Sequence, residues 1–148
     1  MDWFAKAFLK ASLVWLSAGV TLGVAMAAHP VWSVYRVAHE HMNLLGFVTM
    51  MIFGVAYHVI PRFTGVALHS RRIAEAHWWL SNVGLTLMVI GFALRASGAG
   101  PVAVSTAVIA VGGLASAIGA YLFVYNIWRT LGGTAGSVRA NLQRAGRG

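Results

Sequence analysis

The sequence predicts an all-α integral membrane protein folded as a four-transmembrane-helix bundle. Of its 148 residues, 59% are hydrophobic and only 9% are charged, and the mean hydropathy is +0.73. Soluble domains carry about 25% charged residues, so a water-soluble fold is excluded because it could not bury this much apolar surface. Four apolar runs are each long enough to cross a hydrocarbon core of about 30 Å, which takes roughly 20 helical residues.

The basic residues indicate a lipid environment rather than nucleic acid. The chain has 11 Lys and Arg residues against 3 Asp and Glu residues, a net charge of +8. Most of these basic residues lie between and after the apolar runs, where they set membrane topology and attract anionic lipid. We therefore expect the lipid bilayer as a partner and no nucleic acid. The chain has no cysteine, which excludes disulfides, thiolate ligands and covalent attachment of a c-type haem.

The transmembrane domain is expected to cover residues 1–128, with helices at about 8–28, 37–60, 77–95 and 102–128. Residues 1–10 contain aromatic and basic side chains, and they predict a short amphipathic lead that lies at the membrane interface. Pro30 ends the first apolar run, because proline cannot continue a helix without losing a hydrogen bond. Residues 129–148 form a basic, glycine-rich tail that we expect to be flexible.

Two stripes of small residues predict faces of close helix contact. Gly19 and Gly23 form a GxxxG pattern in the first helix, and Gly112, Ser116 and Ala120 recur at every fourth position of the last helix. Small residues let helix backbones approach one another inside a membrane. We expect these two stripes to pack between subunits of an oligomer.

Counting the basic residues predicts the topology. With four spans, both termini lie on one side, and that side would hold nine basic residues: Lys6, Lys10, Arg62, Arg71, Arg72, Arg129, Arg139, Arg144 and Arg147. The other side would hold only Arg36 and Arg95. Because cytoplasmic loops are enriched in Lys and Arg, we expect both termini in the cytoplasm. His39 and His41 then lie near the outer face.

The candidate functional residues lie in the segment Arg36–Gly65, which opens with two histidines around a glutamate. Ionisable groups at membrane depth are costly and therefore mark functional sites. Residues two apart in a helix point about 200° away from each other. His39 and His41 therefore cannot chelate one metal from a regular helix, and we expect them to face different neighbours.

The two histidines lie on helix stripes of different character. The His39 stripe contains Asn43, Gly46, Met50, Gly54 and Tyr57. The small and polar members of this stripe, Asn43 and Gly46, indicate a side that faces protein or a cofactor. The His41 stripe is apolar and suits lipid, a partner subunit or a flat apolar cofactor: Leu45, Val48, Ile52 and Val55.

Haem ligation is one interpretation of this pair. A neutral imidazole is a good axial ligand for haem iron, and two of them give a six-coordinate haem that transfers electrons. Arg36 and Arg95 are expected at the aqueous edge near His39, where cations suit haem propionates. The simpler interpretation is that His39 and His41 are interfacial histidines hydrogen-bonded to their neighbours, and spacing alone leaves both open.

The other histidines offer a second candidate site. His58 lies too far along its helix from His41 to share a cofactor with the first pair. With His69 and His77 it is a candidate for a metal site on the cytoplasmic side. The alternative, which we favour from the spacing, is three separate solvent-exposed histidines.

Two motifs carry a resemblance to a known family: His39-Glu40-His41-Met42-Asn43-Leu44-Leu45-Gly46 and Gly54-x-x-Tyr57-x-x-Ile60-Pro61-Arg62. They resemble the catalytic subunit (subunit I) of haem–copper oxidases and nitric oxide reductases. In that family a His-x-His pair on one transmembrane helix binds two different haems from opposite faces. The resemblance therefore implies that His39 and His41 are axial ligands of haem b, with Arg36 and Arg95 as propionate partners.

The resemblance also implies a role and an assembly. It implies a b-type haem protein of the bacterial inner membrane that transfers electrons to or from a respiratory partner, or binds a gas. The family fold has twelve helices in three similar arcs, and this chain has the length of one arc. Three copies around a threefold axis would rebuild that plan, so we expect a homotrimer in which His39 of one subunit meets His41 of the next, with a dimer as the alternative.

This chain also departs from the family pattern. The large enzymes hold a copper or a second iron beside the active haem, using further histidines on neighbouring helices. The helices expected at 77–95 and 102–128 have no histidine at that depth, so we do not expect this chain alone to reduce oxygen or nitric oxide. The alternative function is copper or haem handling for a respiratory oxidase, with metal contacts at His29, Met42 or His58. A third is a structural subunit without a cofactor.

Overall fold

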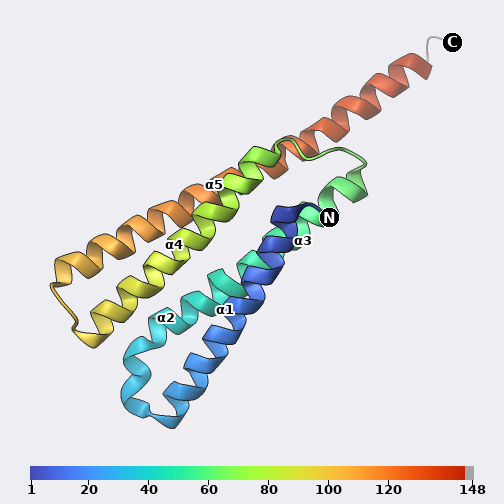
Figure 1. Cartoon of the computed structure of the whole chain (residues 1–148). Helices are drawn as coiled ribbons and strands as arrows, with labels where there is room; N and C mark the ends of the chain where they lie inside the picture. The colour runs from blue at the N-terminus through green and yellow to red at the C-terminus, as the bar shows by residue number, and fades with distance from the viewer. Residues whose placement is uncertain (146–148) are drawn as a thin grey trace.

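The computed structural model describes the backbone of residues 1–145 and the side chains of residues 1–133. Every regular element in the described range is helical, which confirms the predicted all-α class (Figure 1). Four helical stretches are long and apolar enough to cross a membrane: Trp3–Ala28, Pro30–Thr64, Arg71–Ser97 and Val102–Gly133. By the length and composition of its helices, the chain therefore fits a multi-pass membrane protein.

The first helix, α1 (Trp3–Ala28), begins five residues earlier than the boundary expected at residue 8. Phe4 and Phe8 are four residues apart, so they lie on one face of the helix. Both are buried against Tyr57, with ring centroids 5.4 and 6.0 Å away. Residues 3–10 are therefore part of the long helix and their aromatic face belongs to the core, while their position at the membrane interface stays a prediction.

The second membrane-length stretch, Pro30–Thr64, is a rod of four helical segments that follow one another along the chain, and we call it the second rod. A 3₁₀ turn η1 (Pro30–Tyr35) leads into α2 (Arg36–His41), a π-helical segment η2 (Met42–Thr49) and α3 (Met50–Thr64). The rod extends beyond the expected range 37–60 at both ends. It stops at Gly65, which takes the left-handed conformation (φ 65°) that glycine adopts without strain.

The π-helical segment η2 directly follows the two candidate histidines. Such wide turns are rare and occur frequently at functional sites. Within and beyond it, the stripe predicted to face protein or a cofactor packs inside the chain, since Gly46, Met50, Gly54 and Tyr57 are all buried.

The third long helix, α4 (Arg71–Ser97), starts six residues before the boundary expected at residue 77. Ser70 caps it, because the Ser70 hydroxyl accepts a hydrogen bond from the Ile73 N–H at 3.3 Å. The cap places the pair of arginines after Ser70 inside the first turn rather than in a loop.

The last helix, α5 (Val102–Ala145), runs beyond the end expected at residue 128. No proline interrupts the chain there, and a helix that is already nucleated extends at little cost. Much of the segment predicted as a flexible tail (129–148) is thus helical, and its last residues, 146–148, lie outside the described range.

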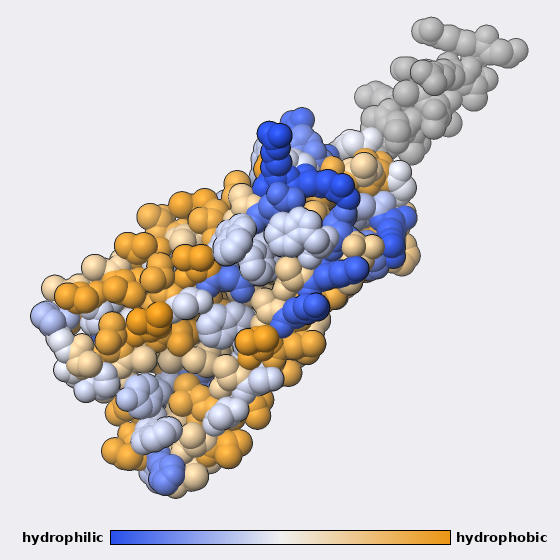
Figure 2. Space-filling view, viewed as in Figure 1, coloured by the Kyte–Doolittle hydropathy of each residue, from blue (hydrophilic) through white to orange (hydrophobic). Residues whose placement is uncertain are grey.

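The helices form two antiparallel pairs. In Figure 1, α1 runs beside the rod of α2 and α3, and α4 runs beside α5. The N-terminus and the end of α5 lie at the same end of the bundle. Figure 2 shows hydrophilic side chains gathered at that end and apolar side chains along the flanks, as the topology prediction requires. The side of the membrane on which this end lies stays a prediction.

The small-residue stripes pack within the chain, which corrects the expectation that they join subunits. A Cβ added at Gly19 would lie 2.7 Å from Asn43 Nδ2, so this stripe receives side chains of the second rod. A Cβ added at Gly84 would lie 2.4 Å from the Ser116 hydroxyl, so Gly112 and Ser116 of the second stripe face α4, whereas Ala120 is exposed. Close helix contact was predicted correctly, but its partner was not.

Candidate functional site

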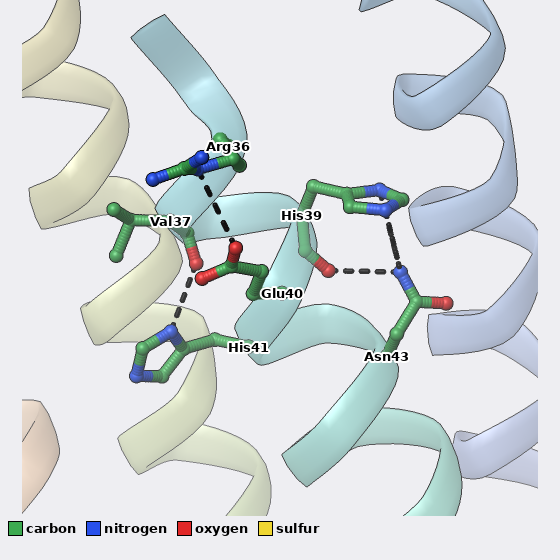
Figure 3. A network of polar contacts seen from close by, with 6 residues as sticks. All are labelled: Arg36, Val37, His39, Glu40, His41 and Asn43. Atoms are coloured by element: carbon green, nitrogen blue, oxygen red, sulfur yellow. Dashed lines mark hydrogen bonds and ion pairs between the residues drawn. The ribbon is translucent and has the colours of Figure 1, made fainter. Parts of the chain in front are cut away.

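His39 points from α2 toward the small-residue face of α1 (Figure 3). Its Nδ1 lies 2.8 Å from the Gly19 carbonyl oxygen. A carbonyl oxygen only accepts hydrogen bonds, so Nδ1 carries the proton and Nε2 keeps its lone pair. Gly23 makes room for the ring, since a Cβ there would lie 2.8 Å from His39 Cε1. The His39 imidazole therefore packs against the GxxxG stripe of α1.

Asn43 fixes the orientation of His39 from one helical turn away. Its Nδ2 donates to the His39 carbonyl oxygen at 2.8 Å and lies 3.3 and 3.5 Å from the two ring nitrogens. The Asn43 side chain in turn lies against Gly19. His39, Asn43 and the two glycines of α1 thus form one connected group, and Asn43 is the predicted site residue that contacts His39 directly.

His41 points to the other side of α2, toward α4 (Figure 3). Its Nδ1 donates to the Val37 carbonyl oxygen at 2.8 Å, so Nε2 again keeps the lone pair. The ring packs against Phe92 of α4, with centroids 4.7 Å apart. As the spacing predicts, the two histidines face different neighbours.

This arrangement fits axial ligation better than chelation. In each ring an Nδ1–H bonded to a backbone carbonyl sets the tautomer and the ring orientation, as is usual for metal-binding histidines. Each Nε2 then keeps a lone pair that suits a haem iron, and at His39 the Asn43 amide nitrogen lies 3.5 Å from this atom. Because the rings lie on opposite sides of α2, they do not share one iron within a chain.

The remaining predicted site residues lie around this pair without joining it. Arg36 pairs with Glu40 at 3.5 Å, and both side chains are more than half exposed. Arg95 is exposed at the same end of the bundle and donates to the Thr106 hydroxyl. Gly46 is buried, and a Cβ there would lie 2.6 Å from Trp15 Cβ. Both arginines are accessible to an anionic group, and Gly46 allows close packing of η2 on α1.

The second candidate metal site, at His58, His69 and His77, does not form. His58 accepts a hydrogen bond from Arg62 at 2.7 Å, and His69 packs edge-on against Tyr125. Among the described side chains, those of residues 1–133, no group of three or more His, Asp or Glu could hold a metal ion. His29 stacks on Trp32 in the turn at the opposite end from His58, so these two do not meet either.

His77 is the residue that the sequence interpretation misplaced. It was expected to be solvent-exposed, but it is 0% exposed in the centre of the bundle. Its Nδ1 lies 3.0 Å from the Tyr57 hydroxyl, and its ring lies among Phe8, Phe53 and Phe123. Its Nε2 is buried with no hydrogen-bond partner among the described residues.

A signal for His77 was present in the sequence. Ser81, Gly84, Met88 and Gly91 follow His77 at helical spacing, and all of them are buried on one face of α4. A stripe of small residues that starts at a histidine indicates a packed face. The helix was expected to start at residue 77, which placed His77 in the first turn at the membrane edge. The stripe that begins at His77 was therefore not recognised as a packed face.

Comparison with known proteins places this geometry in a family context. The sequence model of the family described as cytochrome c and quinol oxidase polypeptide I matches residues 3–135. The chain is 34% identical over 132 residues to a putative cytochrome c oxidase subunit 1-beta of Streptomyces avermitilis, covering 78% of this chain and 23% of that protein. It is 26% identical over 122 residues to cytochrome c oxidase subunit 1 of Rhodobacter capsulatus, covering 66% and 22%.

A third relative is the cbb3-type cytochrome c oxidase subunit CcoN1 of Stutzerimonas stutzeri. The chain is 30% identical to it over 88 residues, which cover 55% of this chain and 19% of that protein. The chain thus spans about one fifth of the length of these relatives.

Proposed function

The chain belongs to the cytochrome c and quinol oxidase polypeptide I family, and from this premise we propose that it is a b-type haem protein of the bacterial inner membrane. In this proposal His39 and His41 are axial ligands, and the protein transfers electrons or binds a small gas. Both termini face the cytoplasm, so the histidines lie near the outer surface. The haem would supply reversible one-electron chemistry at its iron.

The observation that carries this proposal is the contact that both histidines make through Nδ1 with a backbone carbonyl oxygen. Each Nδ1 is 2.8 Å from a backbone carbonyl oxygen, Gly19 for His39 and Val37 for His41. Each Nε2 therefore has a lone pair for iron without any change of protonation.

The surroundings of the pair support a haem more than a bare metal ion. Phe92 gives His41 an aromatic neighbour, and apolar side chains flank a flat cofactor well. Arg36 and Arg95 lie at the same end and are exposed, so they can hold propionates. A bare copper or zinc ion needs several ligands converging on one point, and His39 and His41 diverge.

Oxygen reduction by this chain alone is not part of the proposal. The relatives that it matches are named as oxidase subunits, but the chain spans about one fifth of their length. His77 is buried beside Tyr57, near the opposite end of the second rod from His41. It therefore supplies no second metal ligand next to the pair.

The proposal is tested by haem content after single substitutions. His39→Ala and His41→Ala are each expected to lose or strongly reduce bound haem, because each removes an axial nitrogen. His58→Ala and His69→Ala are matched controls that should keep wild-type haem content. The measurement is haem per chain, by pyridine haemochrome assay on purified protein. If both His39→Ala and His41→Ala keep the wild-type content, the ligand assignment is wrong.

We also propose a homotrimer, because the two ligands of one chain point apart. In a closed threefold ring, His39 of one chain would approach His41 of the next, with one haem at each interface. An exposed apolar groove of about 290 Å³ on the outer face of α3 gives such an interface a surface to bury: Met51, Ile52, Val55, Ala56, Val59 and Ile60.

Native mass spectrometry of the protein in detergent tests this assembly. The proposal predicts a trimer with three haems. A stable monomer that keeps one haem would contradict the shared ligands, and a dimer would contradict the threefold arrangement.

A further inference from the structure

A polar groove lies at the basic end of the bundle, away from His39 and His41. It has a volume of about 530 Å³ and is lined by His69, Trp128, Arg129, Gly132 and Gly133. We propose that this groove binds the phosphate headgroup of an anionic phospholipid. The proposal does not depend on haem binding, because no residue of the histidine pair contributes to it.

One wall of the groove is fixed by hydrogen bonds. The loop between α3 and α4 crosses to α5 (Figure 1), where the His69 N–H donates to the Thr130 hydroxyl at 3.0 Å. The Ser70 N–H donates to Asn126 Oδ1 at 2.9 Å, and Asn126 Nδ2 donates to the Ser70 carbonyl at 2.8 Å. Asn126 and Thr130 are buried. The loop therefore holds His69 beside the turn of α5 that carries Arg129.

The floor of the groove is open because two glycines supply it. A Cβ added at Gly132 would meet no atom within 4 Å. A Cβ added at Gly133 would lie 3.3 Å from Val66, where the loop closes the groove. A compact anion can therefore approach the backbone of α5 between His69 and Arg129.

Charge complementarity favours a phosphate. Arginine offers a planar fork of donors that matches phosphate oxygens, and His69 adds a further ring donor. The chain has only three acidic residues. None of them lines the groove, and each is engaged elsewhere: Asp2 with Arg71, Glu75 with Trp3, and Glu40 with Arg36.

The exposed face of α5 favours a lipid over a free phosphate. Trp128 is 75% exposed and ends the last apolar run, the depth at which tryptophan meets lipid headgroups. Tyr121 and Val124 precede it by seven and four residues, so they share its face of the helix, and both are exposed. This stripe leads from the groove toward the bilayer centre and offers acyl chains an apolar surface.

The test compares retention of phosphatidylglycerol by the full chain and three variants in native mass spectrometry. Arg129→Gln should weaken retention about fivefold, the effect of one basic residue near an anionic surface. Gly132→Leu fills the groove without removing charge and should weaken retention at least as much. Arg72→Gln is the matched control, because it removes an exposed charge at the same end outside the groove and should retain the lipid.

Three results would overturn the proposal. An equal loss in Arg72→Gln and Arg129→Gln would mean that the lipid responds to diffuse surface charge. Equal retention of phosphatidylcholine and phosphatidylglycerol by the wild-type chain would remove the selectivity for an anionic headgroup. Binding of inorganic phosphate that depends on Arg129, without retention of phosphatidylglycerol, would assign the groove to a soluble anion.

Discussion

The buried pair of Tyr57 and His77 gives the sharpest prediction about stability. Tyr57 is 1% exposed and His77 is 0% exposed, and their only mutual hydrogen bond joins the Tyr57 hydroxyl to His77 Nδ1 at 3.0 Å. Tyr57→Phe removes this hydroxyl and keeps the aromatic ring. The ring contacts with Phe4 and Phe8 therefore persist, and the substitution removes only the polar contacts of the hydroxyl.

The magnitude follows from what surrounds His77. Its nearest aromatic neighbours, Phe8, Phe53 and Phe123, offer no hydrogen-bonding group. Its Nε2 already has no partner among the described residues, so Tyr57→Phe leaves both ring nitrogens unpaired. A buried polar atom left without its partner costs about 1–3 kcal/mol of unfolding free energy. We expect Tyr57→Phe to destabilise the protein by that amount.

The assay is equilibrium unfolding of the purified full chain in mild detergent, titrated with a denaturing detergent and followed by circular dichroism. Tyr121→Phe is the matched control, because Tyr121 is 76% exposed and its loss of a hydroxyl should stay within about 0.5 kcal/mol of wild type. The reasoning is refuted if Tyr57→Phe is as stable as wild type, or if the two variants lose equal stability.

Three further predictions concern the candidate site and the topology. Gly23→Ala places a Cβ 2.8 Å from His39 Cε1 and should reduce haem binding, whereas Gly113→Ala, which meets no atom within 4 Å, should not; haem content decides between them. Reporter fusions should read outside at Gly98 and cytoplasmic at Gly148, and the reverse reading would contradict the topology. Purified protein with a reduced electron donor should consume oxygen far more slowly than an oxidase. Rapid consumption in an oxygen electrode would contradict the expectation that this chain alone does not reduce oxygen.

Composition and charge were sufficient to predict the class and the number of helices. A chain that is 59% hydrophobic has no alternative to a membrane-spanning fold, and its four apolar runs became four long helices. The helix boundaries were less accurate. The start of α4 is capped by a hydrogen bond from the Ile73 N–H to the Ser70 hydroxyl, and hydropathy does not register such a cap.

The candidate site was predictable where it depends on helix periodicity. The spacing of His39 and His41 gave their divergence, and the structure adds that Gly19 and Val37 supply the carbonyl oxygens that set the tautomers. Contacts between helices were not predictable from the periodicity of each helix alone. The expected intersubunit role of Gly19 and Gly23 failed for this reason, since a small-residue stripe predicts close packing without identifying its partner.

The π-helical segment η2 was also not predictable from sequence patterns. The helical stripe was drawn with a constant 100° per residue, and η2 departs from that period between His41 and Met50. The stripe nevertheless continued correctly to Gly54 and Tyr57, because small and aromatic residues at those positions pack against α1.

The optical spectrum of the purified full chain, oxidised and then reduced, tests the central claim most directly. Axial ligation by His39 and His41 predicts a sharp Soret band that shifts on reduction, with resolved α and β bands typical of a haem that has two imidazole ligands. Protein purified from cells with ample haem that shows no absorbance in the visible region would contradict the claim.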